Sequence, residues 1–281
     1  MRNDLKFRTR LDATDPFNLE IDRGTALGAA CLAFWPMLEG EGILLTDVAG
    51  GHHTQMLAGT KGRCGWRRIG TRALGFGGAR GIRPVLDFTH EVNGARIVVG
   101  DPLGTLKLVN NFSMFAWVLP RSPGSTSDSA VLSYGTNSYG FHLRGGGSGV
   151  RVAVAKNEAA IILNAGGANS IPLNRWSFVG FTLSAGGTGT GYYNAVQAWT
   201  GAQSQALAAP SRDLYIGACS ESTGVGRNFQ GMMAGIYVFQ GVLTAAQVLA
   251  LYQDPFVLMK RGYQRRSFFK GRSALVRARN S

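Results

Sequence analysis

The sequence predicts an all-β protein in which two antiparallel sheets pack face to face, with one short helix near the C-terminus and an extended arm at each end. Apolar and polar residues alternate over residues 112–119, 175–184, 214–218 and 231–240, as is typical of half-buried strands. The 40 glycines follow no collagen-like period and separate short apolar runs, which favours a turn-rich β protein. With 45% hydrophobic and only 16% charged residues, the chain can build a sizeable core, which excludes a disordered chain.

The chain is predicted to contain one domain and two arms. We assign residues 24–253 to a single sandwich domain, residues 1–23 to an N-terminal arm and residues 254–281 to a basic C-terminal arm. The first arm is polar, mixed in charge and interrupted by Pro16, so it lacks the pattern of a core element.

The first part of the domain has weaker patterns than the rest. Residues 27–37 form a strongly apolar strand candidate that ends at Pro36. Residues 39–57 are predicted to form a loop, a turn and a short strand. The run from Lys61 to Arg83 is rich in Gly and Arg and is predicted to be an irregular connection, and long loops are often functional.

The remainder of the domain is predicted to be a series of short strands separated by Gly, Ser and Asn. The predicted strands cover residues 85–88, 95–100, 112–119, 131–136, 139–145, 150–156, 159–164, 175–184, 191–201, 214–218 and 231–240, with a loop over 121–129. Residues 175–184 and 191–201 are expected to pair as a hairpin through the flexible segment AGGTGT. Trp117 and Trp176 are expected to anchor the core rather than to stack on a ligand.

One amphipathic helix is predicted over residues 244–252. Thr244 is a suitable N-cap residue, because its hydroxyl can accept a backbone N–H at the helix start. Val248, Leu249, Leu251 and Tyr252 are predicted to form an apolar stripe that covers an edge or face of the sandwich.

The net charge of +13 is concentrated in two runs. Seven basic residues and no acidic one lie between Lys61 and Arg83, and eight more basic residues follow Asp254 without an acidic one. Such runs favour acidic partners, namely nucleic acid, an anionic protein surface or a membrane face, and a solvated surface is the alternative.

The cysteines and the N-terminus indicate a protein made in a reducing cytoplasm. Cys31, Cys64 and Cys219 are odd in number and show no CxxC spacing, so we expect buried free thiols. The N-terminus lacks the apolar region of a secretory signal, and no run approaches the ~20 apolar residues of a membrane span. We therefore expect no signal peptide and no membrane partner.

Several blocks, taken in order, resemble the LamG-like, concanavalin A-type jelly-roll family. The segments AFWPMLEGEG and TDVAGGHHTQML resemble the family's opening strand and the Asp-containing turn that follows it. FSMFAWVLP, NRWSFVGFTLS, LYIGA and FQGMMAGIYVF resemble later strands, and GVLTAAQVLALYQDP resembles the final helix. The resemblance covers about residues 27–252 and implies a jelly roll. Members of the superfamily bind glycans, bind calcium, hydrolyse glycosides or serve in adhesion and assembly, and the shared fold does not choose among them.

The carboxylates lack the spacing of a jelly-roll glycosidase. A glycosidase needs two carboxylates across the scissile bond, and the nearest pairs here are Glu39 with Glu41, in a Gly-rich turn, and Asp87 with Glu91, at a strand end. We therefore expect no enzyme activity and no cofactor, and a glycosidase is only a second alternative.

Asp47 is a weak calcium candidate. The resemblance places it at the family's Asp-containing turn, but Ala234 and Gly235 stand where the family has an acidic pair. Asp47 is better explained as a turn residue whose side chain accepts backbone N–H bonds. The adjacent His52 and His53 would point to opposite faces of a strand and could not chelate one ion together.

Glycan binding requires an exposed aromatic platform with polar partners. The candidates are Tyr139, His142, Tyr192, Tyr193 and Trp199, with Asn137 or Asn194 nearby. Each of them could equally be part of the sheet core.

The C-terminal arm determines the functional hypothesis. Its start, LYQDPFVLM, resembles the ends of LamG-like proteins encoded by tailed bacteriophages. Apolar residues between charges suit an arm that orders on an acidic protein surface, so nucleic acid is a less favoured partner. The expected docking residues are Phe256, Arg261, Tyr263, Arg265, Arg266, Phe268, Phe269 and Arg272.

The hypothesis is a structural bacteriophage virion protein, in the form of a capsid decoration protein, a head fibre or a tail component. It would be made in the host cytoplasm, form a homo-oligomer and dock on other virion proteins. The alternative is a carbohydrate-binding module that recognises host-surface polysaccharide.

Overall fold

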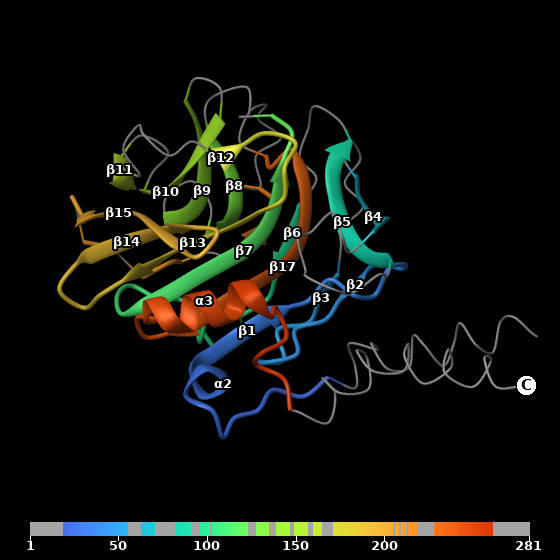
Figure 1. Ribbon diagram of the computed structural model, residues 1–281, viewed down its shortest axis with the longest axis horizontal. Helices are drawn as coiled ribbons and strands as arrows, with labels where there is room; N and C mark the ends of the chain where they lie inside the picture. The colour runs from blue at the N-terminus through green and yellow to red at the C-terminus, as the bar shows by residue number, and fades with distance from the viewer. Residues whose placement is uncertain are drawn as a thin grey trace, which may run out of the picture.

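The computed structural model describes residues 19–55, 63–70, 82–90, 96–101, 103–122, 128–134, 139–146, 149–156, 160–164, 171–204, 206–207, 209–211, 213–218 and 228–260. Two antiparallel sheets pack face to face, which confirms the predicted all-β sandwich (Figure 1). The first sheet has the order β15 (Val196–Ala202), β14 (Thr188–Tyr193), β13 (Ser177–Leu183), β7 (Phe112–Pro120), β17 (Gly231–Gln240), β5 (Ile82–His90) and β4 (Arg63–Gly70), and β1 (Cys31–Trp35) also pairs with β17.

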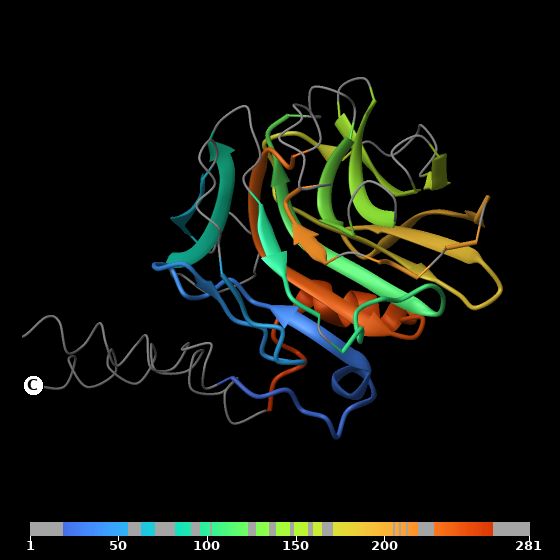
Figure 2. The ribbon, with the colours of Figure 1, turned by 180° about the vertical axis from the view of Figure 1, so that it is seen from behind.

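The second sheet is built from shorter strands. Its order is β11 (Ala160–Asn164), β10 (Gly149–Lys156), β9 (Tyr139–Gly146), β8 (Asp128–Ser133), β16 (Leu214–Ile216) and β6 (Ile97–Val99), with β12 (Ile171–Pro172) pairing with β10. A small ladder joins β2 (Leu44–Leu45) to β3 (Thr54–Gln55). Seen from behind in Figure 2, the second sheet covers the inner face of the first.

The main core lies between the two sheets. Alternate residues of β7, such as Met114 and Val118, point inward with Val179 and Phe181 of β13. This alternation is the packing expected of a sandwich, in which every second side chain faces the other sheet.

A second apolar cluster covers the outer face of the first sheet. Phe115, Trp117 and Phe178 point outward there, beneath helix α3 (Ala245–Gln253). The ring of Trp117 stacks on Tyr252 of the helix, with 5.5 Å between ring centroids. Trp117 and Trp176 are both buried, which confirms their prediction as core anchors.

Helix α3 confirms the predicted C-terminal helix. Thr244 is its N-cap and forms a capping box with Gln247, in which each side chain satisfies a backbone N–H of the other residue. Val248 and Leu251 are buried, but Leu249 is 44% exposed, so its place in the apolar stripe was predicted wrongly. Successive residues turn by about 100° around a helix, which carries Leu249 away from the sheet.

The predicted strand over residues 27–37 is only partly a strand. Residues Ala26–Ala30 form the short helix α2, and β1 starts at Cys31. The hydroxyl of Thr25 accepts the N–H of Gly28, so an N-cap and an alanine-rich turn decide the local structure.

The Gly-rich and Arg-rich run also contains regular structure. The prediction of an irregular connection was wrong for Arg63–Gly70, which forms strand β4 and pairs with β5. An edge strand exposes one side to solvent, so it needs no continuous apolar pattern, and Arg67 and Arg68 occupy exposed positions. The predicted loop over 121–129 likewise ends early, because β8 begins at Asp128.

Residues 191–201 form two strands rather than one. Strand β14 ends at Tyr193, and the chain turns through Asn194 and Ala195, whose φ angles are +48° and +64°, into β15. The side chain of Asn194 fixes this turn by accepting the N–H of Phe178 at 2.9 Å. The turn was missed because Asn-Ala is a weaker hairpin signal than Asn-Gly.

The sandwich extends beyond the predicted C-terminal boundary at residue 253. Leu258 and Met259 are buried in the outer cluster, and Ile21 pairs with Met259 in an isolated bridge. The described ends of the chain at Leu19 and Lys260 therefore leave the domain side by side. The remaining arm residues, 1–18 and 261–281, lie outside the described residues.

Candidate functional site

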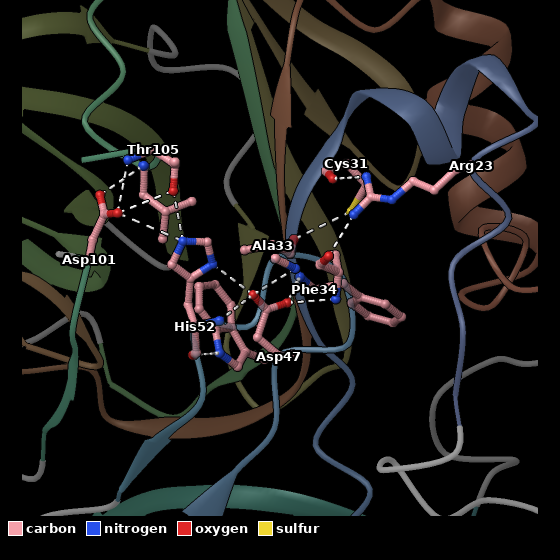
Figure 3. Close-up of polar contacts among 12 residues, drawn as sticks. Arg23, Cys31, Ala33, Phe34, Asp47, His52, Asp101 and Thr105 are labelled. Carbon is pink, nitrogen blue, oxygen red and sulfur yellow. Dashed lines mark hydrogen bonds and ion pairs between the residues drawn. The ribbon is translucent and has the colours of Figure 1, made fainter. Parts of the chain in front are cut away.

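Asp47 is the centre of a buried polar network in the turn after β2 (Figure 3). Its Oδ1 accepts the backbone N–H of Phe34 at 2.8 Å and that of Ala49 at 2.9 Å. Its Oδ2 accepts the N–H groups of Gly50 and His52, both at 3.0 Å. These bonds confirm the prediction that Asp47 accepts backbone N–H groups in a turn.

His52 extends this network to the turn after β6. Its Nδ1 lies 2.8 Å from Oδ2 of Asp47, and its Nε2 lies 2.8 Å from the hydroxyl of Thr105. The hydroxyl and N–H of Thr105 donate in turn to Asp101, at 3.1 and 2.8 Å. Because an ionised carboxylate only accepts hydrogen bonds, Nδ1 of His52 carries a proton.

Asp47, His52 and Thr105 are hydrogen-bonded in series. The same series of carboxylate, histidine and hydroxyl group activates the nucleophile in some enzymes. The Thr105 hydroxyl, however, is shared with Asp101, which also accepts the N–H of Leu106 at 2.8 Å. This set of bonds is typical of a turn fixed by a side chain. We therefore assign the network a bracing role, in which it joins two turns of the sandwich rim.

Arg23 ties the N-terminal segment to the same rim. Its guanidinium donates to the carbonyl groups of Gly28 and Cys31 at 2.9 and 2.6 Å, and to that of Ala49 at 2.6 Å. Cys31 and Cys64 are free thiols, and Cys219 lies outside the described residues. Burial raises the pKa of both thiols, that of Cys64 to about 11, so they are not reactive thiolates.

Two of the four carboxylates considered for catalysis, Glu39 and Asp87, have other partners. Glu39 accepts the N–H of Thr46 at 2.7 Å, and burial raises its pKa. Asp87 pairs with Arg67 at 2.6 Å and with Arg121 at 3.4 Å. Glu41 is exposed, and Glu91 lies outside the described residues.

A cation at Asp47 would have to displace the N–H donors that its two oxygens already accept. Among the residues that the structure describes, no group of three or more His, Cys, Asp or Glu could hold a metal ion. None of the described helices is long and apolar enough to cross a membrane.

Three of the predicted glycan candidates, Tyr139, His142 and Tyr192, lie inside the protein. Tyr139 is 1% exposed, and its hydroxyl donates to the carbonyl of Leu108 in the main core. His142 is 3% exposed, on the opposite side of β9. Tyr192 is buried in the outer cluster, and Asn137 lies outside the described residues. Neither Tyr139 nor His142 presents a ring to solvent.

Tyr193 and Trp199 remain as partly exposed aromatic candidates on the β14–β15 hairpin. Both pack against the rim of the main core, so they share the inner face of the first sheet. The indole of Trp199 lies against the backbone of Gly191, where an added Cβ would be 1.9 Å from Nε1. This Nε1 is buried and has no hydrogen-bond partner among the described residues.

Phe256 is the single predicted docking residue that the structure describes. It is half-buried on its own domain, with its ring centroid 5.1 Å from the guanidinium carbon of Arg83. Arg83 is itself buried, donates to the carbonyl groups of Pro36 and Ala234, and has a pKa lowered by burial to about 10. Arg261, Tyr263, Arg265, Arg266, Phe268, Phe269 and Arg272 lie outside the described residues.

The sequence matches the family model of the concanavalin A-like lectin/glucanases superfamily over residues 93–249, which is more than half of the chain. The protein belongs to this superfamily. A comparison with curated proteins gives no match.

Solved structures share the fold at low sequence identity. Domain 4 of AbnA, a GH43 extracellular arabinanase from Geobacillus stearothermophilus solved in complex with arabinotriose, has a TM-score of 0.57 and 18% identity, over 80% of this chain and 98% of that one. The binding domain of Paraclostridial Mosquitocidal Protein 1 has a TM-score of 0.56 and 11% identity, over 82% of this chain and 53% of that one. The binding domain of botulinum neurotoxin serotype D/C has a TM-score of 0.52 and 12% identity, over 81% and 52%. This chain thus spans about half of each toxin domain.

Proposed function

We propose that this protein is a carbohydrate-binding module that recognises neutral polysaccharide through Tyr193 and Trp199. The observation that carries the proposal is this pair of half-buried aromatic side chains on one face of the β14–β15 hairpin. Tyr and Trp combine an apolar ring with a polar tip, which suits the apolar faces and the hydroxyl groups of a sugar. The unpartnered Nε1 of Trp199 is available to donate to a sugar hydroxyl once the indole shifts outward.

The expected ligand is neutral because the hairpin carries no charge. No Asp, Glu, Lys or Arg occurs between Arg175 and Arg212, so no guanidinium or ammonium group on these strands can pair with an acidic sugar. The match to almost the whole of an arabinanase domain solved with arabinotriose supports a sugar ligand of this kind.

The test is binding of the full chain to a panel of immobilised neutral and acidic polysaccharides, arabinan among them. Trp199→Ala should weaken binding to neutral polysaccharide at least about tenfold, because aromatic anchors dominate most binding energies. Gly191→Ala should weaken it as well, since the added methyl group displaces the indole. Circular dichroism would establish that each variant is folded.

Trp66→Ala is the matched control, because Trp66 is also half-buried in the first sheet but lies on β4, at the opposite margin. The Trp66→Ala protein should bind neutral polysaccharide with the same affinity as the wild type. Equal affinity of the wild type and Trp199→Ala, or wild-type binding to acidic polysaccharides alone, would contradict the proposal.

A second function, attachment to a bacteriophage particle, is favoured by the way the two ends of the domain meet. The N–H of Asp22 donates to the carbonyl of Leu258 at 2.7 Å, and the N–H of Lys260 donates to that of Glu20 at 3.1 Å. Both arms therefore start from one point on the domain, so they could anchor it together to an acidic surface of a larger assembly.

Deleting residues 261–281 tests this attachment and keeps the buried Leu258 and Met259 in place. The truncated chain should stay folded and disappear from gradient-purified virus particles of the source, as measured by mass spectrometry. Its retention at the wild-type copy number, or the absence of the intact chain from the particles, would refute the attachment.

A further inference from the structure

Two arginines meet one nearly buried carboxylate at the β4 margin of the first sheet. Asp87 of β5 is 7% exposed, and its Oδ2 lies 2.6 Å from Nε of Arg67 on β4. Nη1 of Arg121, which follows β7, lies 3.4 Å from Oδ1 and 3.5 Å from Oδ2 of the same carboxylate. In the sheet, β17 and β5 lie between β7 and β4, so the two guanidinium groups reach Asp87 from opposite sides.

Asp87 and Arg67 belong to the outer face of this sheet. Val85, two residues before Asp87, is part of the outer cluster, and Ile69, two residues after Arg67, packs against that cluster. Residues two apart on a strand share a face, so the ion pair lies on the outer side. Helix α3 lies away from β4 and β5 in both ribbon views (Figures 1 and 2). At this margin 55% of the Arg67 side chain is exposed to solvent.

The ion pairs leave donors of both guanidinium groups unused. A guanidinium group has five N–H donors and no acceptor. Asp87 takes the Nε–H of Arg67, so the two terminal nitrogens of Arg67 have no partner among the described residues. Arg121 contacts Asp87 through Nη1, and its side chain is 28% exposed. Two cations against one carboxylate leave an excess positive charge that an anion can offset.

The backbone at Gly65 leaves space for such an anion beside Asp87. Gly65 is the partner of Asp87 across the β4–β5 ladder, and a Cβ added to it would meet no described atom within 4 Å. An anion at this point has donors on two sides, so it needs oxygens that point in several directions. A terminal phosphate group carries three such oxygens, whereas a carboxylate carries two in one plane.

We propose that Arg67 and Arg121 form an oxyanion site for a phosphate monoester, in which Asp87 positions both guanidinium groups. Arginine binds phosphate through paired, charge-assisted hydrogen bonds, and a guanidinium held in place by a carboxylate loses less freedom on binding. The recognised chemistry is the phosphate monoester of a sugar, either free or as a substituent of a polysaccharide. This site lies at the opposite margin and on the opposite face from Tyr193 and Trp199, so it is independent of the neutral sugar site proposed above.

The experiment is titration of the isotope-labelled full chain with glucose 6-phosphate at low ionic strength, followed through the backbone amide NMR signals of β4 and β5. The wild type should show saturable shifts with a millimolar dissociation constant. Arg67→Gln and Arg121→Gln should each raise this constant at least about tenfold. Glucose 6-sulfate, which has the same shape and one negative charge less, should bind more weakly than the phosphate.

A second pair of ligands distinguishes the two sources of the phosphate group. Dextran that carries phosphate monoesters is compared with glucose 6-phosphate, and unsubstituted dextran is the blank. Tighter binding per phosphate group of the substituted dextran would assign the site to a polysaccharide. Equal binding would assign it to a free sugar phosphate.

Arg68→Gln is the matched control, because it removes the same charge from the same strand. Arg68 follows Trp66 by two residues, and Trp66 packs against the main core, so Arg68 lies on the other face of β4. Its loss should change the dissociation constant by no more than about twofold. Arg67→Lys keeps the charge but lacks the planar fork, so it should bind severalfold more weakly than the wild type.

The proposal would be overturned by a wild type that shows no saturable shift with either phosphate ligand. It would also be overturned if Arg68→Gln weakened binding as much as Arg67→Gln, since the site would then be a diffuse positive surface. Wild-type affinity of Arg67→Lys, or equal affinity for glucose 6-sulfate and glucose 6-phosphate, would likewise contradict it. Circular dichroism would establish that each variant is folded.

Discussion

Replacing Asp47 with alanine is expected to lower the free energy of unfolding by about 3–5 kcal/mol, the range observed when one partner of a buried charged network is removed. The reason is the number of donors that would lose their acceptor. The backbone N–H groups of Phe34, Ala49, Gly50 and His52 all point at this carboxylate. A buried donor without a partner loses the hydrogen bond to water that it makes in the unfolded chain. Urea unfolding monitored by circular dichroism would measure the loss.

Asp47→Asn is the matched variant for this prediction. Its amide keeps one acceptor oxygen, so it should lose part of the stability that the alanine variant loses. Thr105→Ala removes only the exposed end of the network and should cost about 1 kcal/mol or less. An Asp47→Ala protein within 1 kcal/mol of the wild type would show that water replaces the carboxylate and that the network is not a brace.

The same carboxylate makes stability depend on pH in the acid range. Burial raises the pKa of Asp47, but the hydrogen bonds from the His52 side chain and from the backbone N–H groups outweigh burial and hold the pKa below its ordinary value of 3.8. A carboxyl group with a depressed folded-state pKa contributes its full stabilisation above the unfolded-state pKa, and the contribution is lost as the pH falls through the folded-state value. Asp47→Asn should therefore unfold with a shallower dependence on acid pH than the wild type.

This network shows where sequence reasoning succeeds and where it stops. The acceptor role of Asp47 was predictable because the donors of Ala49, Gly50 and His52 lie within five residues of it. The link from His52 to Thr105 spans 53 residues and depends on how two rims of the sandwich meet. No local pattern contains that information.

The strands can likewise be divided into those that the sequence predicts and those that it does not. Strands β7 and β17 could be predicted because most of their residues are apolar. Both strands lie in the middle of the first sheet, where nearly all of their residues are buried. Strand β4 was missed because it lies at an edge, where the arginines that signal a loop are also compatible with a strand. The turn at Asn194 was missed although it separates the two strands of the candidate sugar site.

The arrangement of the layers limits where a ligand or partner can reach the first sheet. Its inner face packs on the second sheet, and its outer face is covered by α3 and by residues 254–260. The β14–β15 margin of this sheet carries the partly exposed aromatic side chains Tyr193 and Trp199. For this reason we place the sugar site there, and we expect the terminal arms to act elsewhere.

Phe178→Ala is expected to lower the free energy of unfolding by about 3–5 kcal/mol, the range for large-to-small changes of buried aromatic residues. Phe178 is fully buried in the outer cluster. Its ring centroid lies 5.4 Å from that of Phe115, 5.2 Å from that of Trp117 and 6.1 Å from that of Tyr252 on α3. Removing the ring opens a cavity beneath the helix and ends these contacts.

Leu249→Ala supplies the control from the helix itself. Leu249 was predicted to belong to the apolar stripe, but it is exposed, so its replacement should change stability by no more than about 0.5 kcal/mol. Urea unfolding followed by tryptophan fluorescence would report both values, because Trp117 lies against Phe178. If both variants lost similar stability, the outer cluster would not hold α3 on the sheet. A large loss for Phe178→Ala alone would establish that the helix is fixed by the face it buries and that the first sheet is packed on both sides.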